Sequence, residues 1–195
     1  MLPKIKTSIK DSTFEGRCRR ESKAADLESV PPVGNQRSWL QLASQGKDSS
    51  SIPTPPLNFR MNFDGGSRGN PGISGCGAVI YHDDDEMWSD SFFVGINATN
   101  NHAEYAGLIL GLQQAIDMKI KSLLVQGDSE LIINQMTGKY RCHSANLIEL
   151  YNKAKELEGE FTEIRFQHVL RNFNKRADQL SNIAIQKYID NPSIL

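Results

Sequence analysis

The sequence predicts an α/β fold in which helices pack on both faces of one mixed five-stranded sheet. Two observations support this prediction. Three consecutive segments with strand character open the region 58–195, and helical and strand segments alternate after them. The chain has 195 residues, of which 38% are hydrophobic, so it is long enough to bury a sizeable core. It contains no run of the roughly 20 apolar residues that a membrane-spanning helix needs.

The first strand is predicted over residues 57–64, because apolar side chains alternate with polar ones there. It ends in Asp64, and the segment NFDGGSRGNPG continues with four glycines and an Asn-Pro turn. Residues 75–82 and 86–97 are the second and third predicted strands. The acidic turn 83–85 joins them, which indicates that the pair is antiparallel.

Helices and strands alternate in the rest of the chain. Residues 100–118 have the apolar spacing of an amphipathic helix, with Thr99 or Asn100 at its N-cap. The later elements are expected in this order: a strand at 122–128, helices at 129–136 and 145–158, a strand at 161–169 and a helix at 174–189. Two further strands therefore join the leading three in one mixed sheet.

Residues 1–57 show no sustained period of 2 or 3.6 and end in Ser- and Pro-rich sequence, which predicts a disordered tail and linker. A targeting segment for mitochondria or plastids is the alternative, although six acidic residues dilute the nine basic ones. The three cysteines of the chain lack C-x-x-C spacing. This disfavours a disulfide framework or a zinc site and favours an intracellular location, in the cytoplasm or the nucleus.

Four acidic residues fall near strand ends or helix starts of four different predicted elements: Asp64, Glu104, Asp128 and Asp178. Glu104 lies on the helix face that should meet the sheet, where a carboxylate is costly unless something positive meets it. Each acid also has a purely structural interpretation. Asp128 suits an N-cap, Glu104 and Asp178 suit helix N-termini, and Asp64 suits a turn.

Four sequence blocks contain these acids: FDGGSRGNPG, TNNHAEY, GDSELIINQMTGKY and HVLRNFNKRADQLSN. In their order and spacing they resemble the type 1 ribonuclease H family, and most closely its compact archaeal and plant-like branch. The resemblance covers residues 58 to about 190 and implies a ribonuclease H-like fold for the domain 58–195. A single DGGS block is weak, but four matching blocks are highly specific.

The resemblance implies an endoribonuclease that hydrolyses the RNA strand of RNA/DNA hybrids with two Mg²⁺ ions, or with Mn²⁺ in their place. Asp64 then bridges both ions, Asp178 completes the first site, and Glu104 with Asp128 completes the second. Oxygen-only ligands suit these hard cations. Two ions can activate a water and stabilise the leaving oxygen, which gives a 5'-phosphate and a 3'-hydroxyl.

The resemblance also implies substrate contacts. Asn70, Asn100 and Asn101 match residues that hydrogen-bond the RNA strand, and an amide suits a 2'-hydroxyl because both groups donate and accept. Thr99 matches a residue that holds a phosphate of the DNA strand. The other matched positions are Gly65, Gly66 and Ser67 in the glycine-rich turn that lets backbone approach nucleic acid, His168 for proton transfer or product release, and Asn174 near the site. A turn role for Asn70, capping roles for Asn100 and Asn174, and an inert position at a strand end for His168 stay open.

The chain also departs from the family pattern. Asn97 stands where many members have an arginine in the DNA-phosphate pocket, and no basic, tryptophan-rich insertion lies between residues 137 and 160. We expect a monomer, without the hybrid-binding module of many eukaryotic members. Two other functions stay open: a catalytically silent nucleic-acid-binding module, and a nuclease of the same fold that acts on double-stranded RNA or DNA. The intact set of four acids favours an enzyme, since a pure binder gains nothing from acids that face phosphates.

Overall fold

The computed structural model describes residues 57–192. The predicted tail and linker lie outside the described residues except for Leu57, and their disorder stays a prediction. The described domain is built on a five-stranded sheet with the order β3-β2-β1-β4-β5. Its strands are β1 (Phe59–Gly69), β2 (Gly72–His82), β3 (Asp85–Ala98), β4 (Ser122–Gly127) and β5 (Glu163–His168). Neighbours among β1, β2 and β3 are antiparallel, whereas β4 runs parallel to both β1 and β5. The predicted mixed sheet is confirmed.

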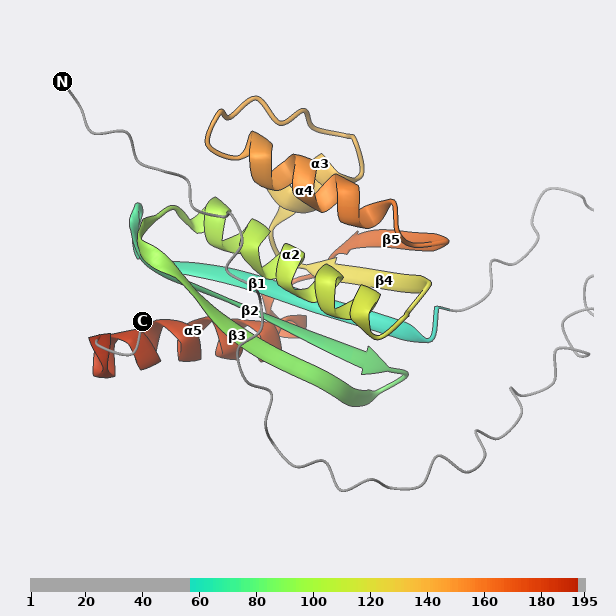
Figure 1. Cartoon of the computed structure of the whole chain (residues 1–195), viewed down its shortest axis with the longest axis horizontal. Coiled ribbons are helices and arrows are strands. Elements are labelled where there is room, and N and C mark those ends of the chain that lie inside the picture. The colour runs from blue at the N-terminus through green and yellow to red at the C-terminus, as the bar shows by residue number, and fades with distance from the viewer. Residues whose placement is uncertain (1–56, 193–195) are drawn as a thin grey trace, which may run out of the picture. The chain divides into compact units, whose positions relative to one another are not determined.

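Helices cover both faces of this sheet, as predicted (Figure 1). They are α2 (Asn100–Asp117), α3 (Glu130–Met136), α4 (Ile148–Glu158), the short 3-10 helix η1 (Arg171–Phe173) and α5 (Lys175–Asp190). The helix α2 packs on β1 and β2 with α4 beside it, and α5 packs on β1 and β2 from the opposite face. The two central strands are therefore enclosed between α2 and α5.

The alternation that predicted β1 sorts its side chains between these two faces. Met61 and Phe63 are fully buried and belong to the main hydrophobic core, together with Leu108 of α2. Their neighbours Asn62 and Asp64 point the other way and hydrogen-bond to residues in α5 or directly before it. The polar side of β1 thus carries a carboxylate into the contact with α5.

β1 is longer than the sequence suggested. The prediction ended the strand at Asp64 and treated the following glycines as a turn, but residues 65–69 pair continuously with residues 72–76 of β2. The turn falls at residues 70 and 71 instead. Glycine adopts extended backbone as readily as a turn, and the ladder with β2 decides between the two. Asp64 therefore lies in the middle of a strand.

Close approach between α5 and the sheet depends on a glycine of β2. A Cβ atom at Gly77 would lie 2.3 Å from the Cβ of Leu180 and 2.8 Å from the main-chain nitrogen of Ser181. Any side chain at this position would push the helix away from the sheet. The sequence of β2 therefore sets how closely the last helix can approach the central strands.

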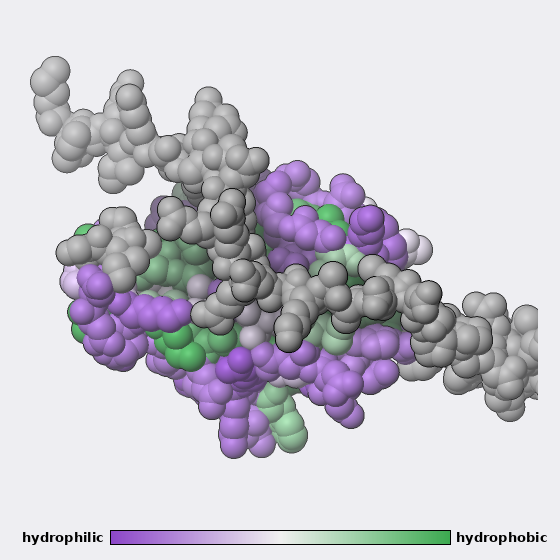
Figure 2. All heavy atoms as spheres, turned by 60° about the horizontal axis from the view of Figure 1, so that its bottom comes forward, coloured by the Kyte–Doolittle hydropathy of each residue, from purple (hydrophilic) through white to green (hydrophobic). Residues whose placement is uncertain are grey.

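The surface of the domain is largely polar where its described residues are visible in Figure 2, and apolar side chains show there in small separate areas. Exposed large hydrophobic residues come from different elements, such as Ile96 of β3 and Phe173 of η1. Within residues 57–192, no helix is both long enough and apolar enough to span a bilayer.

Candidate active site

The four acidic residues that the sequence singled out line one pocket. Asp64 comes from the middle of β1, Glu104 from the start of α2, Asp178 from the first turn of α5, and Asp128 from the residue that follows β4. The rest of the lining consists of Gly65, Gly66, Ser67, Arg68, Asn100, Arg171, Ser181, Asn182 and Ile185. The fold thus gathers four carboxyl groups and two guanidinium groups in one polar hollow.

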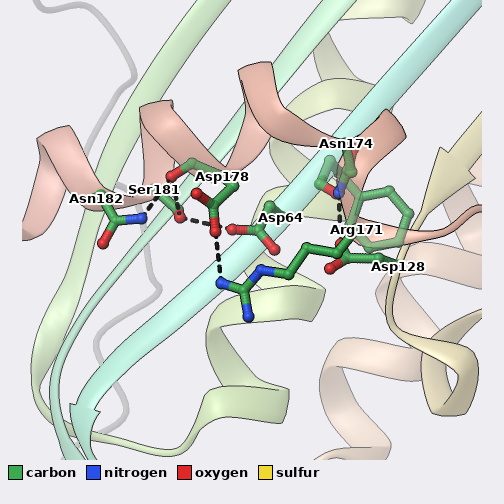
Figure 3. Close-up of polar contacts among 8 residues, drawn as sticks. Asp64, Asp128, Arg171, Asn174, Asp178, Ser181 and Asn182 are labelled. Carbon is green, nitrogen blue, oxygen red and sulfur yellow. Dashed lines mark hydrogen bonds and ion pairs between the residues drawn. The ribbon is translucent and has the colours of Figure 1, made fainter.

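Asp64 is buried at the base of this cluster, with 6% of its surface exposed. Burial raises the pKa of its carboxyl to about 6, and the nearby charges of Asp128 and Asp178 act in the same direction. The hydroxyl of Ser181 donates to Asp64 Oδ2 at 2.6 Å and opposes the rise (Figure 3). The site therefore holds Asp64 with a neutral donor in a place that disfavours its charge.

Glu104 is the most strongly perturbed acid of the pocket. It is only 6% exposed, and burial, with the charges of Asp64 and Asp128 in addition, raises the pKa of its carboxyl to about 9. Its Oε2 atom is buried and has no hydrogen-bond partner among the described residues. A buried oxygen without a partner is costly, so this carboxyl is poised to accept a proton or a cation.

Asp128 is oriented by an amide rather than acting as a helix cap. The helix α3 has Ser129 as its N-cap, and Asp128 lies one residue before it. Asp128 Oδ1 instead accepts a hydrogen bond of 2.6 Å from Asn174 Nδ2. Asn174 is the N-cap residue of α5, but its side chain makes no capping bond within the described domain and is 99% buried. The side chains of Asp128 and Asn174 therefore bond to each other and do not cap α3 and α5.

The orientation of the Asn174 amide follows from its hydrogen bonds, one of which comes from Asn62. Asn174 Nδ2 also donates to the main-chain oxygen of Phe63 at 2.8 Å, so both of its acceptors require the nitrogen on that side. Asn174 Oδ1 then faces Asn62 Nδ2, which donates to it at 3.2 Å. A chain of buried amides therefore runs from the polar side of β1 to the carboxylate of Asp128.

Asp178 is paired with a cation at the mouth of the pocket. Arg171 of η1 donates to Asp178 Oδ1 at 2.6 Å, and this pairing raises the pKa of the guanidinium (Figure 3). The Asp178 side chain is 29% exposed and that of Arg171 78% exposed, so solvent screens the pair. Arg171 pairs with one of the four acids, and within residues 57–192 no salt bridge reaches the deeper ones.

The chemistry of the donor set suits divalent cations. Among residues 57–192, no three His, Cys, Asp or Glu side chains converge closely enough to hold an ion as they stand. Asn174 holds Asp128, and Arg171 holds Asp178. The pocket nevertheless offers four carboxyl groups, a buried oxygen of Glu104 without a partner, and raised pKa values at its two buried acids. Hard oxygen donors of this kind match Mg²⁺ or Mn²⁺.

Two comparisons decide the family. Residues 62–184 match a family described as reverse transcriptase-like. Ribonuclease HI from Halobacterium salinarum is 32% identical over 176 residues, which cover 89% of this chain and 88% of that protein. The chain belongs to the type 1 ribonuclease H family. The alignment with the Halobacterium salinarum protein is longer than the described domain, so it includes residues that precede β1.

Solved structures agree with this membership. The N-terminal ribonuclease H domain of Rv2228c from Mycobacterium tuberculosis is 36% identical, has a TM-score of 0.67, and covers 71% of this chain and 100% of its own. LC11-RNase H1 in complex with an RNA/DNA hybrid is 36% identical, has a TM-score of 0.63, and covers 67% and 99%. By sequence, this chain spans 35% of the bifunctional protein Rv2228c, to which it is 41% identical over 126 residues.

The two glycines after Asp64 differ in what they allow within this ribonuclease H fold. A Cβ atom at Gly65 would lie 2.1 Å from main-chain atoms of Ala103 and Glu104, so the absent side chain serves the packing of β1 against α2. A Cβ atom at Gly66 would meet only ordinary contacts, the nearest being 3.7 Å from Ile185. Only Gly66, of this pair, is free of a packing requirement and open to a role in substrate approach.

Residues matched to RNA contacts lie around the start of α2. Asn100 lines the pocket, and its main-chain N–H donates to Asn70 Oδ1 at 3.1 Å, which ties the β1–β2 turn to the helix. Thr99 is the N-cap, and its hydroxyl accepts from the main-chain nitrogen of His102 at 3.3 Å. Asn101 is half-buried and does not line the pocket. Asn70 and Thr99 therefore already have structural partners.

His168 lies at the end of β5, beside the end of β4. It is exposed, and its Nε2 atom is 3.3 Å from the main-chain oxygen of Asp128. The imidazole is thus next to one of the four acids but is not part of the pocket lining. This position suits a group that exchanges protons with solvent.

Ser181 and Asn62 are among the residues of the site that escaped prediction. Ser181 is 1% exposed and Asn62 is 3% exposed, and both hydrogen-bond to residues of the acidic cluster or to their partners. Asn62 stood out only as a polar position of an alternating strand. Ser181 lies three residues after Asp178, which is the one signal that places it on the same side of α5 as an acid.

Proposed function

We propose that the protein is an endoribonuclease that hydrolyses the RNA strand of RNA/DNA hybrids with two divalent metal ions. The observation that carries the proposal is the gathering of four carboxyl groups in one pocket, with the buried Oε2 of Glu104 lacking a partner among the described residues. Membership of the type 1 ribonuclease H family supports it, as does the likeness to LC11-RNase H1, which was solved with an RNA/DNA hybrid.

The four acids hold the metal ions. Asp64 would contribute to both ion sites, Asp178 to one of them, and Glu104 with Asp128 to the other. When bound, two Mg²⁺ or Mn²⁺ ions activate a water and stabilise the leaving oxygen, so that cleavage gives a 5'-phosphate and a 3'-hydroxyl. With a cation bound, Asp178 would ligate it in place of Arg171, and the exposed guanidinium would be available for a phosphate.

The start of α2 reads the RNA strand. Asn100, which lines the pocket, would bind a 2'-hydroxyl through its side-chain amide, with Asn70 and Asn101 beside it. Gly66 lets the sugar-phosphate backbone approach β1, with Ser67 beside it. Thr99 holds a phosphate of the DNA strand next to the helix N-terminus. These residues fix the register of the hybrid, so that the scissile phosphate meets the carboxylates.

Two further assignments complete the proposal. His168 moves a proton at the solvent side of Asp128, or speeds product release, because its ring lies at the edge of the acidic cluster. The protein acts as a monomer inside the cell, in the cytoplasm or nucleus. The free thiols of Cys76 and Cys142 support a reducing compartment.

Cleavage of a defined substrate set tests the proposal. An RNA/DNA hybrid, the matching double-stranded RNA, and the matching double-stranded DNA are each incubated with Mg²⁺, with Mn²⁺, or with EDTA. Asp128→Asn is compared with Asp117→Asn, which makes the same chemical change at an exposed position. We expect hybrid cleavage with either metal, no cleavage with EDTA, and a fall of at least about a thousandfold in Asp128→Asn, roughly 4 kcal/mol in barrier.

The outcomes separate the competing functions. Products with 5'-phosphate ends from the RNA strand support the proposal. Hybrid binding without cleavage by the parental protein would indicate a silent binding module. Preferential cleavage of double-stranded RNA or DNA would indicate another substrate. Parental rates in Asp128→Asn would remove this residue from the metal site.

A further inference from the structure

One hydroxyl in the pocket contacts two of the four acidic residues at once. Ser181 Oγ lies 2.6 Å from Asp64 Oδ2 and 2.9 Å from the main-chain oxygen of Asp178 (Figure 3). The residue is 1% exposed and projects from α5 toward β1. A serine buried this deeply loses its hydration, so its single proton has to be used within the site.

The Ser181 hydroxyl proton can go to Asp64 Oδ2 or to the main-chain oxygen of Asp178, and the other hydrogen bonds of these two acceptors decide between them. The main-chain oxygen of Asp178 also accepts from Asn182 Nδ2 at 2.8 Å. Among the described residues, Ser181 is the one side chain that hydrogen-bonds to the Asp64 carboxylate. Hydrogen bonds to ionised acceptors are shorter and roughly twice as strong as neutral ones. The proton therefore points to Asp64 Oδ2 when that carboxyl is ionised.

The main chain of Ser181 is fixed tightly against the sheet. A Cβ atom at Gly75 would lie 2.8 Å from the Ser181 main-chain oxygen, and a Cβ atom at Gly77 would lie 2.8 Å from its nitrogen. Backbone of α5 and backbone of β2 are thus in direct contact at this residue. Because β2 also pairs with β1 at Asp64, the donor and its acceptor are held in one rigid unit.

We propose that Ser181 is a positioning residue that sets the orientation of the Asp64 carboxylate before a divalent cation binds. The inference rests on the proposed function, because it assigns Asp64 as a metal ligand. A hydroxyl that holds Oδ2 limits rotation of the carboxylate, and as a neutral group it leaves the full negative charge for the cation. Ser181 acts through Asp64 and contacts no reacting atom.

The test uses Ser181→Ala and a matched control. Alanine removes only the hydroxyl and favours the helix, so α5 is preserved. Ser89→Ala is the control, because the Ser89 hydroxyl also donates to a carboxylate at 2.6 Å, that of Glu86, outside the pocket. Mn²⁺ affinity is measured by calorimetry without substrate, and kcat and KM are measured on a defined hybrid at low and high Mg²⁺.

We expect Ser181→Ala to bind Mn²⁺ about tenfold more weakly than the parental protein, as loss of an outer-shell partner usually does. Its kcat at low Mg²⁺ should fall by a similar factor and recover at high Mg²⁺, while the KM for the hybrid stays unchanged. Ser89→Ala should match the parental protein in all of these measurements. A purely structural role for Ser181 would lower thermal stability without this metal-dependent recovery.

Parental Mn²⁺ affinity in a folded Ser181→Ala variant would overturn the inference. If that variant fails to fold by circular dichroism, Ser181→Cys decides, since it keeps a side chain of similar size with a weaker donor. Parental Mn²⁺ affinity in the cysteine variant would overturn the inference equally. A parental protein that neither binds Mn²⁺ nor cleaves the hybrid would refute the proposed function as well. A parental protein that does both, with Ser181→Ala equal to it, would refute the role of Ser181 alone.

Discussion

Replacing Glu104 by glutamine should make the metal-free protein more stable at alkaline pH. The carboxyl of Glu104 is buried and its Oε2 atom lacks a partner among the described residues, whereas a glutamine of the same shape carries no charge. Burial, with the charges of Asp64 and Asp128 in addition, raises its pKa from 4.5 to about 9 in the folded protein. The folded protein therefore keeps a proton over a range where the unfolded chain has released it.

The size of the effect follows from this difference. Wherever the folded state binds one more proton than the unfolded chain, the free energy of unfolding falls as pH rises, by about 1.4 kcal/mol per pH unit. For Glu104, the free energy of unfolding falls in this way from about pH 4.5, the ordinary pKa of the group, to about pH 9, its pKa in the folded protein. Asp64 contributes a similar fall only up to about 6. Between roughly pH 6.5 and 8.5, the free energy of unfolding of Glu104→Gln should therefore gain about 2–3 kcal/mol over that of the parental protein.

Urea denaturation in EDTA at several pH values across this range measures the difference. Glu149→Gln, at an exposed position of α4, is the control and should follow the parental protein throughout. Other groups that titrate in this range are common to all three proteins, so they cancel in the comparison. Parallel curves for Glu104→Gln and the parental protein would refute the conclusion that Glu104 is protonated in the metal-free fold.

Three further predictions concern the partners of the acids and the N-terminal region. Asn174→Ala should lower stability by about 1–3 kcal/mol in urea denaturation, because buried groups lose their donor, and should slow hybrid cleavage through Asp128. Arg171→Met should change the thermal midpoint by the equivalent of less than about 1 kcal/mol, since its pair with Asp178 is exposed, but should weaken hybrid binding in a filter assay. Deletion of residues 1–57 should leave kcat unchanged in the cleavage assay and reduce affinity at low salt at most modestly.

The fold was largely predictable because its signals are local. Alternation in residues 57–64 indicated a strand, apolar spacing in residues 100–118 indicated a helix, and Thr99 was one of two expected caps. The error at the end of β1 also has a local cause. Glycines usually mark turns, and only the pairing of residues 65–69 with β2, which is a contact with another segment, shows that the strand continues.

The site was predictable only in part, for the same reason. The four acids lie in sequence blocks that identify a family. Ser181 lies in one of these blocks too, but its contact with Asp64, like that of Asn62 with Asn174, depends on a distant partner. Ser181 is 117 residues away from Asp64 in the chain, and Asn62 is 112 residues away from Asn174. No periodicity within β1 or α5 reveals those pairings. The purpose of Gly65 was also hidden, since its close neighbour is the backbone of α2.

The way in which the acids are held explains how the pocket can be ordered and still keep negative charge for a cation. Lysine or arginine partners would fix Asp64 and Asp128 equally well, but they would also neutralise the charge that attracts a divalent cation. A hydroxyl and an amide orient these two carboxylates without neutralising them. The one cationic partner in the described part of the chain, Arg171, meets Asp178 at the solvent-exposed mouth, where exchange for another cation costs least. Burial, with the repulsion between these carboxylates in addition, raises the pKa values of the buried acids and makes their charged forms costly in the metal-free fold. A cation that binds only the folded protein relieves that repulsion, so metal affinity and fold stability are coupled through the same carboxylates.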